Sequence, residues 1–250
     1  MNHQVLLLPG AVLPRDLAYG ALLDALGEGV DAVAKDLEVY ATPEPPAGFG
    51  LATEVEGALR EADASGFERF HIVGYSAGGA ISAALAAAHP NRVRSLSLLE
   101  PAWLGNEGAS AEEMRVYARI EAVGELPWDQ QMPAFVREQL APGVSPPPPP
   151  PGPAPEWMRQ RPAGIAALTR AFREYHLDPA ALGAFGGPVY FALGSLSNQD
   201  LYGGMAERAE RLFADFTLDV FEGRHHFDPP HRIEPARLAE RLRLVWERAT

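Results

Sequence analysis

The sequence predicts an α/β domain with a mostly parallel sheet, helices on both of its faces and an inserted helical cap. Short apolar runs alternate with longer helical patterns over residues 1–100 and again over residues 188–250, as is typical of parallel strands joined by crossover helices. Residues 101–187 break this rhythm, because they contain helical patterns without comparable apolar runs. We therefore expect a core built from both ends of the chain, with the cap inserted between the two parts.

The core rhythm resolves into strands and helices of ordinary length. The expected strands are Val5–Leu8, Val30–Val39, Phe67–Val73, Val93–Leu99, Pro188–Leu193 and Phe216–Phe221. The expected helices are Asp16–Leu26, Leu51–Ala64, Ala77–Ala88, Met205–Phe213 and Pro235–Arg248. Asp16 stands where its side chain would cap the first helix.

The expected cap helices flank a segment of unusual composition. These helices are Ala111–Ala122, Pro133–Leu140 and Ile165–Tyr175. Between the second and the third lies a proline-rich segment, residues 142–155, in which residues 146–151 are all proline. Proline fixes φ and has no amide donor, so we expect either an extended polyproline-type spacer or a disordered segment here.

Charge and composition exclude several classes of function. The formal net charge is −12 and Lys35 is the only lysine, so the chain repels phosphate backbones and we expect no nucleic-acid partner. The absence of cysteine excludes disulfides, thiol nucleophiles and thiolate metal sites. The first apolar run stops at Pro9, and no stretch approaches the roughly 18 apolar residues of a membrane span. We expect a cytoplasmic protein with no membrane partner.

A Gly-x-Ser-x-Gly pattern marks the candidate nucleophile. Gly74, Ser76 and Gly78 fall between an apolar strand and an alanine-rich helix, where a tight turn would expose the serine hydroxyl. Small residues two positions before and after the serine let the strand and the helix approach closely. We therefore predict that Ser76 is a nucleophile.

The same turn provides half of an oxyanion hole. The backbone NH of Ala77 stands at the start of the helix, where unpaired donors and the helix dipole favour a developing negative charge. The other donor is expected from the loop after the first strand, and we favour the NH of Ala11.

Over nearly its whole length the chain resembles the α/β-hydrolase superfamily, with a cap inserted at residues 101–187. In that family the base is a histidine after the last strand, typically in a Gly-x-x-His-Phe context. Gly223, His226 and Phe227 match this context, so the resemblance implies that His226 is the base and leaves His225 as the adjacent alternative. An imidazole can accept the serine proton and return it to the leaving group.

The acid departs from the commonest family pattern. The family usually places an aspartate three residues beyond the glycine that ends the strand before the acid, but here Gly194 is followed at that position by Ser197. Some members carry the acid on the strand after the nucleophile helix instead, where this chain has Glu100. Glu100 is our first candidate and Asp200, in the nearer loop, the second; a dyad without an acid remains open.

Further residues suggest the substrate pocket. Trp103 and Tyr75 are candidates, the first because it follows Glu100 closely in the cap and the second because it precedes the nucleophile. The cluster of His225, Asp228 and His231 matches no zinc motif, so we expect no metal and no cofactor.

The sequence thus predicts a carboxylesterase-like hydrolase that acts on a small ester, lactone or thioester through an acyl-enzyme. Its partner would be a small-molecule acyl substrate, and the protein would be a monomer or a homodimer. Two alternatives remain: a non-catalytic binding protein on the same scaffold, and a cofactor-free lyase or perhydrolase that uses the same triad.

Overall fold

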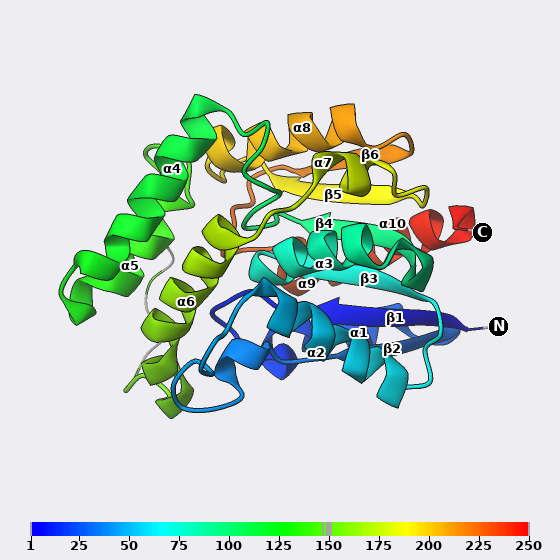
Figure 1. The fold of residues 1–250 in the computed structure, drawn as a ribbon, viewed down its shortest axis with the longest axis horizontal. Helices are drawn as coiled ribbons and strands as arrows, with labels where there is room; N and C mark the ends of the chain where they lie inside the picture. The colour runs from blue at the N-terminus through cyan, green and yellow to red at the C-terminus, as the bar shows by residue number, and fades with distance from the viewer. Residues whose placement is uncertain (1, 147, 149–151, 250) are drawn as a thin grey trace.

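A six-stranded parallel sheet forms the centre of the molecule (Figure 1). The computed structural model describes residues 2–146, 148 and 152–249. The strand order is β2-β1-β3-β4-β5-β6, and every neighbouring pair is parallel. The strands are β1 (His3–Leu8), β2 (Val30–Ala34), β3 (Phe70–Tyr75), β4 (Val93–Leu99), β5 (Val189–Gly194) and β6 (Phe216–Phe221). The predicted fold class is confirmed.

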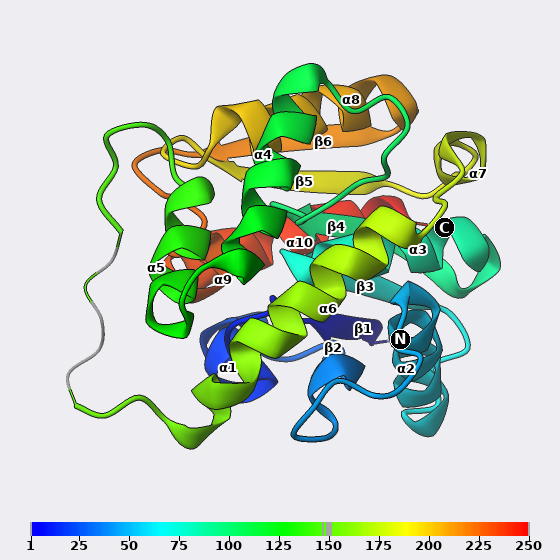
Figure 2. The ribbon, with the colours of Figure 1, turned by 60° about the vertical axis from the view of Figure 1, so that its left-hand side comes forward.

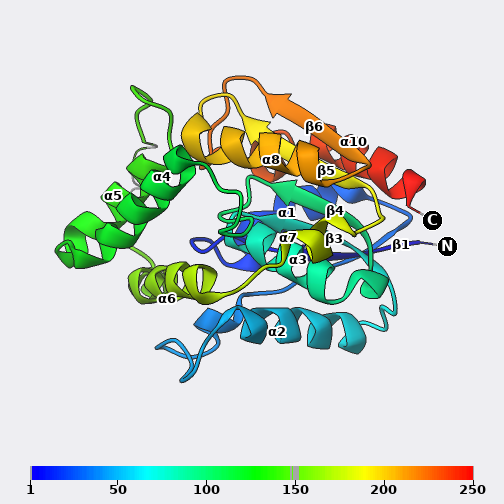
Figure 3. The same ribbon diagram turned by 45° about the horizontal axis from the view of Figure 1, so that its top comes forward.

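Helices cover both faces of this sheet, as the views in Figures 1 and 3 show. One face carries α1 (Arg15–Leu26), α9 (Pro230–Ile233) and α10 (Pro235–Arg248), and the other carries α2 (Leu51–Ala64), α3 (Ala77–Ala88), α7 (Pro179–Gly183) and α8 (Gly204–Leu212). In β1, Leu6 packs toward α2 and α3, whereas Leu7 packs toward α1 and α10. Because both faces are buried, the central strands read as continuous apolar runs rather than alternating ones.

The second strand is shorter than predicted. β2 ends at Ala34, and residues Glu38–Tyr40 form a 3₁₀ turn instead of continuing the strand. The buried carboxylate of Glu54, on α2, accepts the amides of Glu38 and Val39 at 2.8 and 2.9 Å. These bonds hold the turn, so the prediction of a strand to Val39 was wrong.

Helix starts were predicted less well than helix interiors. α1 begins at Arg15 with Pro14 at its N-cap, so Asp16 lies in the first turn and does not cap the helix. Asp36 accepts the amide of Arg15 instead, at 2.8 Å. That carboxylate comes from a distant part of the chain, which local spacing does not reveal.

Three cap helices cross the carboxyl ends of the strands (Figure 2). They are α4 (Ala111–Ala122), α5 (Trp128–Glu138) and α6 (Arg161–Glu174). α5 begins five residues before the predicted start, so Pro133 lies inside the helix instead of at its first position. Residues 147 and 149–151 of the predicted proline spacer lie outside the described residues.

Within the described ranges, no helix has both the length and the apolar composition needed to cross a membrane.

Candidate active site

A strained turn between β3 and α3 presents the hydroxyl of Ser76. Ser76 has φ 53° and ψ −117°, a conformation that non-glycine residues rarely adopt. Its amide donates to Leu99 on β4 at 3.1 Å, and its carbonyl accepts the amide of Ala102 at 2.8 Å. Contacts on the neighbouring strand therefore hold the strained residue in place.

Glycines on either side of the serine allow this turn. A Cβ on Gly74 would lie 2.3 Å from the carbonyl oxygen of Gly78, and a Cβ on Gly78 would lie 2.0 Å from the carbonyl oxygen of Leu8. Both distances are far shorter than atomic contact permits. The close approach of β3, α3 and β1 therefore requires glycine at both positions, as the sequence pattern indicated.

The structure brings Ser76, His226 and Glu100 into one hydrogen-bonded row. The Oγ of Ser76 lies 3.1 Å from Nε2 of His226, and Nδ1 of His226 lies 3.0 Å from Oε2 of Glu100. A carboxylate only accepts, so Nδ1 carries the proton and Nε2 is free to accept from the serine. The three residues are between 1% and 5% exposed, so water competes weakly for these bonds.

Glu100 is held at the carboxyl end of β4 by the adjacent strand. Its φ is 45°, its amide donates to the carbonyl of Ala192 at 3.1 Å, and its Oε1 accepts the amide of Gly194 at 2.7 Å. One carboxylate oxygen therefore binds β5 while the other binds the histidine. This arrangement orients the carboxylate without a second charged partner.

Aromatic rings fix the plane of the imidazole. Tyr202 stacks on His226 with a centroid distance of 4.7 Å and an interplanar angle of 12°, and Tyr75 lies on His226 at 4.9 Å. The hydroxyl of Tyr75 donates to the carbonyl of His226. Burial, followed by the charge of Glu100, raises the pKa of both tyrosines well above the usual range. Both rings are therefore neutral at physiological pH.

The second acid candidate, Asp200, lies apart from this row. It is exposed in a π-helical turn (Gln199–Gly203), and its amide donates to the side chain of Asn198. The loop after β5 binds the cap instead: Ser197 pairs with Leu140, and Asn198 donates to the carbonyl of Glu138 at 2.7 Å. The loop position where the family usually has its acid thus binds the cap to the core.

The alternative base, His225, also points elsewhere. Its Nε2 lies 3.3 Å from Asp228, and its Nδ1 accepts the amide of Phe227 at 3.2 Å. His231 is fully buried beside the rings of Tyr19 and Tyr75. Among the described residues, no three histidine or carboxylate side chains gather as a metal would need.

The two residues whose amides are expected to hold an oxyanion both line one cavity. Ala11, Ser76 and Ala77 all line this cavity, whose volume is about 150 Å³. Ala77 is the first residue of α3, so its NH has no acceptor within the helix. The NH of Ala11 bonds to no backbone carbonyl of the described residues. Both donors are therefore available to a ligand.

Most of the cavity wall comes from the cap. Trp103 lines it, stacks on Phe172 at 5.8 Å and donates from its indole to Asn106 at 2.8 Å. Tyr75, the other predicted pocket residue, does not line this cavity because its ring faces His226 and His231. Phe135, one of the cap aromatic side chains that could have lined a pocket, also lines it. Sequence reasoning did not single out the other apolar lining side chains: Ile120, Ile165, Leu168, Phe172, Leu201 and Tyr202. Their helical spacing could have suggested an inward face but not what that face covers.

Comparison with known proteins agrees with this architecture. Residues 18–147 match the family model described as the alpha/beta hydrolase fold. A search of curated sequences finds a region 38% identical over 85 residues to the dihydrolipoyllysine-residue acetyltransferase component of the acetoin cleaving system from Cupriavidus necator. That match covers 34% of this chain and only 23% of the relative.

Solved structures of low sequence identity share the fold over nearly the whole chain. A bacterial membrane phospholipase A superposes with a TM-score of 0.71 at 21% identity, covering 98% of this chain and 79% of the other. A thermophilic esterase from Thermogutta terrifontis superposes with a TM-score of 0.70 at 17% identity, covering 100% and 92%.

Proposed function

Because the chain belongs to the alpha/beta hydrolase fold family, we propose that it is a serine hydrolase that cleaves small esters, lactones or thioesters through an acyl-enzyme. The observation that carries the proposal is the row from Ser76 through His226 to Glu100, with bonds of 3.1 and 3.0 Å. The esterase fold shared with the Thermogutta terrifontis protein supports the same reaction class.

In the first half of the reaction, Ser76 attacks the acyl carbonyl. Its proton passes to Nε2 of His226 as the Oγ–carbon bond forms, and Glu100 stabilises the resulting imidazolium. The carbonyl oxygen becomes an oxyanion that accepts from the amides of Ala77 and Ala11. As the tetrahedral intermediate collapses, the leaving alkoxide or thiolate takes the proton from His226. The resulting alcohol or thiol departs, or, for a lactone, stays attached to the acyl group as its hydroxyl.

In the second half, water takes the place of the leaving group. His226 accepts a proton from this water, whose oxygen attacks the acyl carbon bound to Ser76. The same amides hold the second oxyanion. Collapse returns the proton to the serine oxygen and releases a carboxylic acid, so the enzyme returns to its starting state.

The position of Glu100 favours this reaction over a silent binding protein. That alternative depended on the missing acid after Gly194, and the carboxylate that bonds His226 comes instead from β4.

Labelling with a fluorophosphonate probe tests the proposal, together with turnover of p-nitrophenyl esters and an acyl thioester. We expect one adduct on Ser76 and ester turnover that falls by about 10⁶-fold in Ser76→Ala. Ser65→Ala, at the end of α2, is the matched control and should keep both labelling and turnover. Labelling and turnover that persist in folded Ser76→Ala would refute the proposal.

A further inference from the structure

The cavity beside Ser76 is small and apolar. Its volume of about 150 Å³ resembles that of an apolar cavity able to hold one benzene ring. Two charged side chains, Glu121 and Arg173, also line it, but they pair with each other and are about half exposed. Among the described lining residues, no unpaired charged side chain is therefore left for a charged acyl group.

A second cavity lies next to the first, among the cap helices. It measures about 290 Å³ and is lined by residues of α4, α5 and α6 and of the 3₁₀ turn Val123–Glu125 between α4 and α5. Ile120, Phe135 and Ile165 line both cavities and are the apolar side chains between them; Thr169 and the paired Glu121 and Arg173 also line both. Each of the three cap helices supplies one of these apolar side chains, and Phe135 and Ile165 are only 9% exposed.

We propose that the cavity beside Ser76 is the acyl site and that Phe135, with Ile120 and Ile165, forms the wall that limits acyl length. The substrate class is then an ester or thioester with a compact, uncharged acyl group, either benzoyl-sized or a chain of about six carbons. This inference rests on the proposed function and adds its substrate range. A longer chain meets the ring of Phe135 instead of entering the second cavity.

The test compares kcat/KM for p-nitrophenyl esters from acetate to decanoate, with benzoate included. The wild-type protein should prefer butanoate, hexanoate and benzoate and should cleave decanoate at least tenfold more slowly. Phe135→Ala should join the two cavities and raise the decanoate-to-butanoate ratio at least tenfold. Phe135→Leu, which leaves a smaller void, should move the ratio in the same direction with less risk to folding.

Met132→Ala is the matched control, because Met132 lies on the same helix and lines the second cavity but not the cavity beside Ser76. It should leave the acyl-length profile unchanged. A wild-type profile flat within threefold, or equal shifts in Met132→Ala and in the Phe135 variants, overturns the inference and leaves the proposed function intact. Absence of turnover with every ester, and of Ser76 labelling, overturns the proposed function and the inference with it.

A different observation concerns the loop that carries the Ala11 amide. The hydroxyl of Tyr40 donates to the carbonyl of Ala11 at 2.7 Å, and Nε of Arg161 donates to the carbonyl of Val12 at 2.8 Å. The guanidinium of Arg161 lies 3.8 Å from the centre of the Tyr40 ring. A Cβ on Gly164 would lie 2.1 Å from the same ring, so α6 packs directly on the tyrosine.

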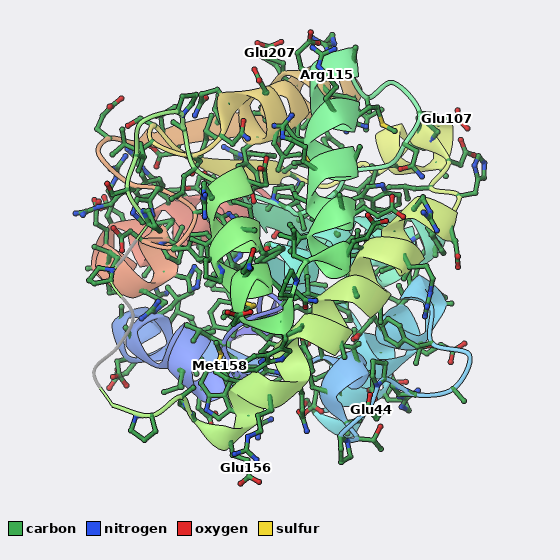
Figure 4. All side chains as sticks on the ribbon, turned by 90° about the vertical axis from the view of Figure 1, so that its left-hand side faces the viewer. Glu44, Glu107, Arg115, Glu156, Met158 and Glu207 are labelled. Carbon is green, nitrogen blue, oxygen red and sulfur yellow. The ribbon has the colours of Figure 1, made fainter. Side chains whose placement is uncertain are left out.

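This contact joins the cap to the oxyanion loop. In the view from the cap side, α6 crosses the molecule diagonally and Met158 precedes its first turn (Figure 4). Arg161 is 4% exposed, and its Nη1 is buried without a hydrogen-bond partner among the described residues. An arginine buried with an unsatisfied nitrogen adds little stability by itself, which favours a functional reason for its place.

The geometry points to Tyr40 and Arg161 as positioning residues that hold the Ala11 amide toward the oxyanion. They bind the two carbonyls that follow this amide, so they hold the loop that carries the NH without touching the substrate. Their loss should therefore weaken binding of the transition state more than binding of the substrate.

Tyr40→Phe removes only the hydroxyl, and Arg161→Met keeps the length of the side chain. Each should lower kcat about five- to tenfold with little change in KM, as expected for one lost hydrogen bond. The Ki of a trifluoromethyl ketone, which forms an oxyanion on Ser76, should rise by the same factor. Arg159→Met removes an exposed arginine from the same segment and should change neither constant.

A purely structural role predicts a different pattern. If either variant lowers the melting temperature but leaves kcat and the ketone Ki within twofold, the positioning role is refuted. Arg161→Lys retains a donor and should restore part of kcat; failure to exceed the Arg161→Met value would also count against it.

Discussion

The carboxyl edge of the sheet and the cap above it are held in different ways. At the sheet edge, Ser76 and Glu100 have positive φ values of 53° and 45°, and bonds to the neighbouring strand hold each of them. In the cap, helices present apolar side chains to a cavity and join the core through a few polar contacts. Reaction chemistry thus depends on backbone geometry, whereas substrate range depends on side chains that can change without disturbing the sheet.

Polar contacts among the described residues attach the cap to the core at several places, of which three involve the side chains of Arg161, Asn198 and Glu113. Arg161 reaches the oxyanion loop, and Asn198 holds the end of α5. Glu113 of α4 pairs with Arg208 of α8 at 2.7 Å, with side-chain exposures of 1% and 11%. Each of these contacts is local, so a single substitution can break it without breaking the others.

The largest effect is expected at the sheet edge. Glu100→Gln keeps the shape of the side chain but removes the charge that stabilises the imidazolium, so kcat should fall by about 10³- to 10⁴-fold. The measurement is kcat for a p-nitrophenyl ester at saturation. Asp200→Asn is the control and should retain kcat within twofold; a larger loss there than in Glu100→Gln would reverse the assignment of the acid.

The next effect is expected at the buried joint of the cap. Glu113→Ala leaves Arg208 buried without its carboxylate, so the free energy of unfolding should fall by about 3–5 kcal/mol. Urea denaturation measures this change. Residual kcat/KM of the folded variant should stay above that of Glu100→Gln, because the joint lies outside the catalytic row; a stability loss below 1 kcal/mol would show that the joint is dispensable.

Acid should destabilise the core through buried histidines. Burial, followed by the charges of Arg232 and His226, lowers the pKa of His231 to about 3, so the unfolded chain binds a proton that the folded protein rejects between pH 6.5 and 3. The contribution of His231 to the free energy of unfolding is fully present above pH 6.5 and is lost progressively as the pH falls toward 3. At pH 5 this group alone should remove about 2 kcal/mol.

His231→Phe tests this pH effect, because both ring nitrogens of His231 lack a partner among the described residues and an apolar ring can occupy the site. The variant should lose about 2 kcal/mol less than the wild type between pH 7 and pH 5 in urea denaturation. His71 contributes in the same direction, since burial lowers its pKa to about 3 as well. His89→Gln, which removes an exposed imidazole, should keep the wild-type difference.

The smallest effect is expected on the outer face of the cap. Arg115 pairs with Glu112 at 2.7 Å, both side chains are more than half exposed, and Arg115 lies at the periphery in Figure 4. Arg115→Ala should change the free energy of unfolding by less than about 0.5 kcal/mol, because water and salt screen such pairs. A loss comparable to that of Glu113→Ala would contradict the distinction between buried and exposed joints.

The sequence alone predicted the parallel sheet and the nucleophile turn, because both depend on short-range patterns. Continuous apolar runs specify strands buried on both faces, and Gly74 and Gly78 mark the close approach around Ser76. The resemblance to the family predicted His226 as the base, and the lack of an acid after Gly194 favoured Glu100 as the acid. Pocket residues were predicted incompletely, since Trp103 lines the cavity but Tyr75 does not.

The tertiary structure alone decided which carboxylate lies against the imidazole, where β2 ends and what the cap encloses. These features depend on atoms that are far apart in the chain: Glu100 and His226 are separated by 126 residues, and the bonds that end β2 come from Glu54. The local sequence pattern indicates which face of a helix or strand is apolar, but it does not indicate which element packs against that face. The sequence therefore determined the reactive turn, and packing of the cap on the sheet edge determined the space in which it acts.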